Sequence, residues 1–314
     1  MSRLNFLISL IFYTILILLS LPFISVSLIT LLAYSLGYIF IIGFFYPQIG
    51  LFLFLFTRPL LDYFTEQKLF EFKTYNINLA SLWGIAVLLL VAHIIYKNYH
   101  RFRELPLFRP WLIFVLIIII TIPLSVHTAL SLRELIRILT IISFFVLGFL
   151  MIQKDHHLIN LAKIAIYSML IPGILAYYQF FTNTGLTLPL EDIYNRIYGT
   201  FAHPNLFAFY LIIPLILTCV IVLIKKKEDI TTYSFLLFLG FLFVLLILTY
   251  TRGAWLAFFL ALFIIGILKY RKVFLMAIVA FLLIYITIPT FQERTDKIVN
   301  PDPYGSIIWR FELW

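Results

Sequence analysis

Long apolar runs dominate the chain, and polar residues occur mainly in the short stretches between them. A helix needs about 20 apolar residues to cross the hydrocarbon core of a bilayer. Runs of this length predict about 11 membrane-spanning helices. Their predicted limits are residues 4–21, 23–41, 44–60, 78–97, 110–126, 133–152, 158–181, 204–224, 231–250, 253–269 and 272–290.

Composition supports this interpretation of the pattern. Hydrophobic residues make up 63% of the chain and charged residues only 12%, and the mean hydropathy is +1.08. Because only helices and closed barrels satisfy the backbone in lipid, helix-length runs predict an all-α, polytopic membrane bundle. We expect one transmembrane domain over residues 1–314, and an uncleaved first span at 4–21 in preference to a signal peptide.

Basic residues between the runs set the predicted orientation, because short cytoplasmic loops are rich in Lys and Arg. One face collects Arg3, Lys97, Arg101, Arg103, Arg109, Lys154, Lys225, Lys226, Lys227, Lys269, Arg271 and Lys272. This face, with the N-terminus, is predicted to be cytoplasmic. The outer face then holds the loops near 61–77 and 182–203 and the C-terminal stretch 291–314. The net charge of +9 is thereby explained without a nucleic-acid partner.

Several common catalytic motifs are absent from the sequence. It contains no glycine-rich phosphate loop, HExxH, CxxC or acid-rich cluster suited to a metal. We therefore predict neither a cofactor nor a metal ion. Cys219 is the only cysteine, so no disulfide can form within the chain.

A compact polar stretch, Arg196 to Asn205, stands directly before one predicted span. Pro204 suits the first turn of a helix, whose exposed N–H groups can bind an anion. Arg196 and His203 beside them would add to such a site. The alternative is a turn that caps the helix and carries an interfacial arginine.

A second motif, Thr251-Arg252-Gly253-Ala254-Trp255, joins two further spans. Arg252 can contact phosphate oxygens in a bidentate way that lysine cannot. Gly253 and Ala254 allow close approach of helix backbones. The alternative here is a cation placed at the level of the lipid headgroups.

Together these motifs resemble a known superfamily. The pattern RxxGTFxHPN at 196–205, TRGAW at 251–255, the tail at 302–314 and RPLLD at 58–62 are similar to those of O-antigen ligases and Wzy-type polymerases. The resemblance implies a metal-independent, inverting glycosyltransferase of the GT-C type in the bacterial cytoplasmic membrane. Its donor would be a glycan on undecaprenyl pyrophosphate, and its acceptor a lipid A core, another lipid-linked glycan or, in some relatives, a protein.

The resemblance also implies roles for individual residues. Arg196, Arg252 and Arg310 match the family's arginines that hold the pyrophosphate. Tyr198, Asn205 and Gly253 are expected to support that site.

The family's catalytic histidine lies in a large outer loop, whereas this sequence ends at Trp314, where that loop would begin. We therefore expect a C-terminally truncated chain, which would be inactive as it stands. His203 is a candidate for the general base or for a residue that orients the donor.

Two other functional classes remain open at this point. A transporter or flippase for lipid-linked sugars would also need outer-face arginines, but typically carries ionisable residues at mid-membrane depth and paired halves. Here nearly all charges fall at the ends of the predicted spans. A membrane scaffold would explain the hydrophobicity but not the two polar motifs.

The predicted orientation can be tested by cysteine labelling. Asn183→Cys and Asp302→Cys should react with a membrane-impermeant thiol reagent added outside the cell, and Lys226→Cys should not. Outside labelling of Lys226→Cys would invert the predicted topology.

Overall fold

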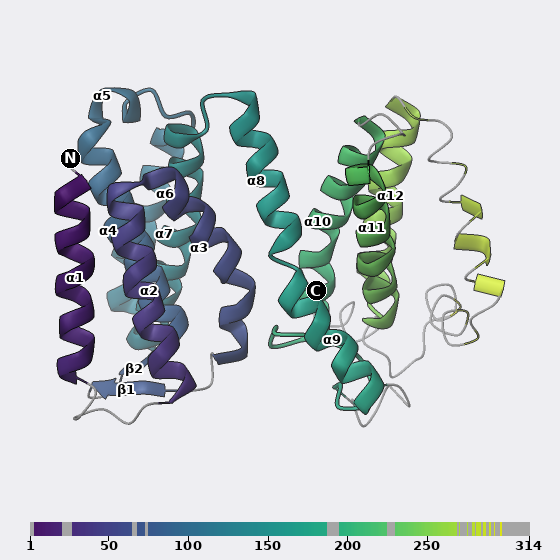
Figure 1. Ribbon diagram of the computed structural model, residues 1–314, viewed down its shortest axis with the longest axis horizontal. Coiled ribbons are helices and arrows are strands. Elements are labelled where there is room, and N and C mark those ends of the chain that lie inside the picture. The colour runs from purple at the N-terminus through teal and green to yellow at the C-terminus, as the bar shows by residue number, and fades with distance from the viewer. Residues whose placement is uncertain are drawn as a thin grey trace. The chain divides into compact units, whose positions relative to one another are not determined.

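The computed structural model consists almost entirely of helices in the residues that it describes (Figure 1). These residues are 3–20, 27–64, 68–72, 75–186, 195–224, 230–268, 270 and scattered positions from 275 to 296. The chain forms two compact units, Met1–Ile164 and Ala165–Trp314. The tail with Arg310, and most of the predicted span 272–290, lie outside the described residues.

The first unit is a helical bundle with one small hairpin. Its elements are α1 (Arg3–Ser20), α2 (Leu28–Phe45), α3 (Pro47–Leu61), β1 (Lys68–Phe72), β2 (Tyr75–Asn78), α4 (Leu79–Lys97), α5 (Tyr99–Phe102), α6 (Phe108–Thr121), α7 (Thr128–Met151) and most of α8 (Asp155–Tyr167), with 3-10 turns at Asp62–Phe64 and Ile122–Leu124. Helix α4 packs against α2, α3 and α7, and its side chains Trp83, Val87 and Leu90 are buried in the core.

The β1–β2 hairpin is the one sheet among the described residues of an otherwise helical fold. Its strands are antiparallel, with Phe72 paired to Tyr75 and Lys68 paired to Asn78. Its strands lie in the predicted outer loop 61–77, except that the second strand ends at Asn78. Sequence periodicity did not reveal it, because strands of four or five residues give too short a pattern.

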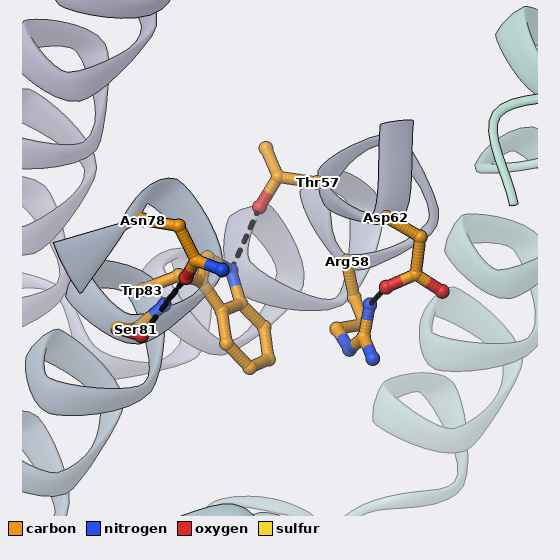
Figure 2. Close-up of polar contacts among 6 residues, drawn as sticks. All are labelled: Thr57, Arg58, Asp62, Asn78, Ser81 and Trp83. Carbon is orange, nitrogen blue, oxygen red and sulfur yellow. Dashed lines mark hydrogen bonds and ion pairs between the residues drawn. The ribbon is translucent and has the colours of Figure 1, made fainter. Parts of the chain in front are cut away.

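Polar side chains fix the ends of α3 and α4 beside this hairpin (Figure 2). Asn78 caps α4, where its Oδ1 accepts hydrogen bonds from the backbone N–H and the hydroxyl of Ser81 at 2.9 and 2.8 Å. The Trp83 indole donates to Thr57 Oγ1 at 3.2 Å. Arg58 pairs with Asp62 one turn later at 2.7 Å, which places the charges of the RPLLD motif in a local ion pair.

The second unit contains α9 (Leu170–Thr182), α10 (Pro204–Ile224), α11 (Ile230–Leu248) and α12 (Arg252–Leu268). Helix α10 packs against α11 and α12, and α9 packs against α11. The core between them is built from large apolar side chains such as Phe207, Leu211, Leu245, Trp255 and Phe258.

The helical run 155–182 is interrupted between α8 and α9. Ser168 and Met169 form a turn in which the Met169 N–H bonds to the carbonyl of Ile166, three residues back. Pro172 has no N–H, so it cannot supply the helical hydrogen bond to the carbonyl of Ser168. The proline accounts for the break.

Among the described residues, four helical segments are long and apolar enough to cross a membrane. They are Leu79–Lys97, Leu130–Met151, Asp155–Thr182 and Pro204–Ile224, close to four of the predicted spans. Shorter apolar helices occur at Leu4–Leu18, Ile29–Phe45, Phe108–Leu124, Tyr233–Leu248 and Arg252–Ile267. The fold is thus compatible with a membrane helical bundle, while the count of about 11 spans stays a prediction.

Two glycines allow α2 and α3 to meet closely on either side of Tyr46. A Cβ added to Gly50 would collide with the backbone of Gly43, and both glycines are buried. Small residues let helix backbones approach in this way.

We therefore expect Gly50→Ala to force α2 and α3 apart and to lower the free energy of unfolding by about 1–3 kcal/mol. Gly240→Ala is the matched control, because nothing lies within 4 Å of its added Cβ. It should be neutral or stabilising by up to about 1 kcal/mol. Thermal unfolding in detergent measures both, and equal effects would contradict the close approach.

Candidate functional site

The polar stretch before α10 folds back along the end of α9. Asn183 ends α9 in the left-handed conformation, with φ of 53°. Leu186 and Arg196 then exchange two backbone hydrogen bonds, of 2.8 and 3.0 Å. The Asn195 side chain donates to the carbonyl of Asn183 at 2.8 Å. These bonds close the base of the loop and direct residues 196–201 into the protein.

Most of this segment is buried although it is not helical. Ile197 is fully buried and Phe201 nearly so, and both belong to the core of the second unit. Buried backbone N–H and carbonyl groups that have no helical partner need hydrogen bonds from elsewhere in the protein. The segment therefore needs dedicated donors and acceptors.

Gln179 of α9 supplies several of them. Its Oε1 accepts hydrogen bonds from the backbone N–H groups of Tyr198 and Gly199, at 3.0 and 2.8 Å. Its Nε2 donates to the carbonyl of Gly199 at 2.9 Å. The side chain is only 5% exposed, so these bonds form away from solvent. One carboxamide thus holds two successive residues of the loop.

Gly199 is required at its position for two reasons. Its φ is +59°, a backbone conformation that residues other than glycine rarely adopt. An added Cβ would also lie 2.6 Å from the carbonyl oxygen of Pro172. The loop can lie against α9 only because this residue has no side chain.

Arg196 joins the loop to the turn between α11 and α12. Its Nε donates to the carbonyl of Thr249 at 3.0 Å, and its Nη2 donates to Asn205 Oδ1 at 2.7 Å and to Thr251 Oγ1 at 3.0 Å. The residue is 5% exposed. Its charge lies at the C-terminal end of α11, where the helix dipole favours a cation.

The rest of this turn is also internally bonded. Tyr250 adopts a left-handed conformation, with φ of 50°. The carbonyl of Leu246 accepts hydrogen bonds from Thr249 Oγ1 at 2.7 Å and from the Trp255 indole at 2.9 Å. The turn therefore has a defined shape, and this shape sets where α12 begins.

The N-terminal ends of α10 and α12 meet through these contacts. Asn205 lies in the first turn of α10, and Thr251 immediately precedes α12; Thr251 Oγ1 and Asn205 Oδ1 are 3.2 Å apart. Arg252 is the first residue of α12 and is partly exposed, and Gly253 is exposed. A Cβ added to Gly253 would lie 3.5 Å from Phe209 of α10. Two positive helix ends and Arg252 therefore share one region.

His203 stands just before α10 and is partly exposed. Its Nδ1 accepts a hydrogen bond from the backbone N–H of Asn205 at 3.1 Å. Burial lowers the pKa of His203 from its ordinary value, and the nearby charge of Arg196 lowers this pKa further.

The structure brings together most of the residues singled out in the two motifs. Arg196 bonds to Asn205, and its charge lies close enough to His203 to affect the pKa of the ring. Arg252 begins the adjoining helix α12. Tyr198 takes part through its backbone N–H. Arg310 lies outside the described residues.

Two residues that hold the polar loop in place were not predicted from the sequence. Gln179 and Thr249 were overlooked, although both are polar residues at the ends of apolar runs, a signal that could have drawn attention to them.

The described residues contain no group of three or more His, Cys, Asp or Glu side chains that could hold a metal ion. Comparisons with family models, with curated proteins and with solved structures found no match for this chain.

Gln179→Leu should lower the free energy of unfolding by about 2–4 kcal/mol, because it leaves buried N–H and carbonyl groups unsatisfied. Gln153→Leu is the control: Gln153 is exposed, and its side chain donates a hydrogen bond to the carbonyl of Leu150. Its effect should stay below about 1 kcal/mol. Chemical denaturation in detergent compares the two, and a Gln179 effect as small as the control's would show that the carboxamide does not hold the loop.

Proposed function

We propose that the protein is a membrane glycosyltransferase. It moves a glycan from an undecaprenyl-pyrophosphate donor to a lipid or glycan acceptor at the outer face of the bacterial cytoplasmic membrane. Ligase and polymerase reactions share this chemistry and differ in the acceptor. The similarity of the two motifs to the O-antigen ligase and Wzy-type polymerase superfamily supports the proposal.

The observation that carries the proposal is the meeting of the two motifs at one place. Residues 196–205 and 251–255 are about fifty positions apart in the sequence, yet Arg196 bonds directly to Asn205, Thr249 and Thr251. The helix ends brought together there, with Arg252, favour an anion. A pyrophosphate is the anionic part of the proposed donor.

The residues divide into two proposed roles. Arg252 is partly exposed at the start of α12, and we assign it, with Arg310 of the tail, to direct contact with the pyrophosphate oxygens. Arg196 is buried within its own hydrogen-bond network, so we assign it to holding the pyrophosphate site together. We assign Gly253, which is exposed beside Arg252, to a supporting role.

In the proposed reaction an acceptor hydroxyl attacks C1 of the donor sugar. The bond from C1 to the pyrophosphate oxygen breaks, and its electron pair leaves with the pyrophosphate. Arginine and helix N–H groups already in place stabilise this charge without a metal. The hydroxyl proton passes to a base, which the resemblance places in a later outer-face loop.

A second candidate is a transporter or flippase for lipid-linked sugars. The break between α8 and α9 favours it, because transporters often build their sites from discontinuous helices. Reconstitution into vesicles distinguishes the two functions. A flippase moves a labelled lipid-linked sugar between leaflets without a change in covalent structure, whereas the proposed enzyme alters the glycan itself.

Arg252→Lys should lower glycan transfer by about tenfold or more, because lysine keeps the charge but loses the bidentate contact. Transfer is measured by mass spectrometry of the glycan products in cells that carry the variant as the only copy of the gene.

Arg133→Lys is the matched control, since Arg133 is an exposed arginine near the start of α7. It should transfer glycan at the parent rate, and both variants should reach the membrane in equal amounts. Parent-like transfer by Arg252→Lys would remove Arg252 from the donor site.

A further inference from the structure

The hydrogen bond to His203 fixes which ring nitrogen carries the proton. A backbone N–H can only donate, so the contact from Asn205 N to His203 Nδ1 at 3.1 Å requires an unprotonated Nδ1. In a neutral imidazole the other nitrogen is then protonated. His203 therefore presents an N–H at Nε2 and has its Nδ1 lone pair already engaged.

Charges around the ring favour this neutral form. His203 directly precedes α10, a helix of 21 residues whose N-terminal end carries partial positive charge. Arg196 acts on the ring from the loop, and Arg252 begins the neighbouring helix α12. Among the described residues of the second unit, the one carboxylate is Asp296, which accepts a hydrogen bond from Tyr285 at 2.8 Å.

We propose that His203 is a neutral hydrogen-bond donor, which directs its Nε2–H toward a phosphate-type oxygen and does not act as a general base. The choice of ligand rests on the proposed function. The protonation state does not rest on the proposed function: it follows from the bond between Asn205 and His203 and is favoured by the charges around the ring.

Acting as a base would conflict with this arrangement. A general base needs a free lone pair within reach of the proton that it takes. Protonation of Nδ1 would break the bond to Asn205 and place a second full charge beside Arg196. A neutral donor, in contrast, can contact an anion that the two arginines and the helix ends have attracted.

Nitrogen NMR of the full chain labelled with ¹⁵N-histidine tests the protonation state directly. The His203 signals are identified by their loss in His203→Gln. At pH 7 we expect a protonated Nε2 and an unprotonated Nδ1. A protonated Nδ1, or an imidazolium at that pH, would overturn the proposal.

Two arginine variants test the cause of the neutral state. Arg196→Gln removes the neighbouring charge and should raise the pKa of His203, whereas Arg196→Lys keeps a charge and should raise it less. Both pKa values come from the pH dependence of the same signals. Equal values in all three proteins would show that Arg196 does not act on the ring.

Glycan transfer by two variants distinguishes a hydrogen-bond donor from a base, because the amide side chains of Gln and Asn match different parts of the histidine ring. Glutamine places an N–H near the position of Nε2, whereas asparagine reaches only as far as Nδ1. A donor role predicts that His203→Gln keeps transfer within about threefold and that His203→Asn loses about tenfold or more, the factor for one hydrogen bond to a charged group. Equal and large losses in both variants would instead identify a base.

Inorganic pyrophosphate is the probe for the ligand. Its binding, followed by calorimetry, should shift the Nε2 signal of His203 and leave Nδ1 bonded to Asn205. Binding without a shift at Nε2 would overturn the donor role. Absence of any binding would count against the proposed function and the ligand named here, while the NMR result at pH 7 would still decide the protonation state.

Discussion

The second unit depends on one requirement: irregular backbone among apolar helices must find its hydrogen-bond partners inside the protein. Arg196 and Gln179 meet much of it. The Arg196 guanidinium donates to the carbonyl of Thr249 after α11, to Thr251 before α12 and to Asn205 in the first turn of α10. The Gln179 carboxamide accepts hydrogen bonds from the backbone N–H groups of Tyr198 and Gly199. Without these two side chains, burial of the loop would cost several hydrogen bonds. These contacts therefore fix how the loop after α9 lies against the adjoining ends of α10, α11 and α12.

In the first unit, too, an arginine bonds to backbone carbonyls at the C-terminal end of a helix. Arg101 of α5 donates to the carbonyls of Phe149 and Leu150, at 3.3 and 3.4 Å, at the C-terminal end of α7. Gln153 adds a bond to the carbonyl of Leu150, and Gln48 adds a longer one to the carbonyl of Met151. In each unit an arginine from another segment thus places its charge where the helix dipole is negative. Arg101 and Arg196 thus contribute to the fold of their units.

Helices were predictable from the sequence because apolar runs of membrane length leave few other structures. The four longest apolar segments lie close to predicted spans, and Pro204 does begin α10. The β1–β2 hairpin and the break at Ser168 were not predicted, because they depend on short pairings and on a single proline.

For the site, residue type indicated which side chains matter but not what they contact. Arg196 was expected to hold a pyrophosphate, and that role stays a prediction. Its bonds to Thr249 and Thr251 could not be foreseen, since only the fold brings these residues to it. Gln179 escaped notice because it acts on the main chain of a distant loop, a relation that no local pattern records. The contact of Arg252 with a ligand stays a prediction.

Gln179 binds the loop through main-chain atoms, which determines which loop positions tolerate substitution. The bonds to positions 198 and 199 involve only main-chain atoms, so they do not depend on the side chain of Tyr198, which is partly exposed. Position 199 is restricted to glycine, whereas its neighbour can change without disturbing the loop's path. Glycine at position 199 is thus fixed by geometry, whereas the side chain at position 198 can be exchanged while the main chain of the loop stays in place.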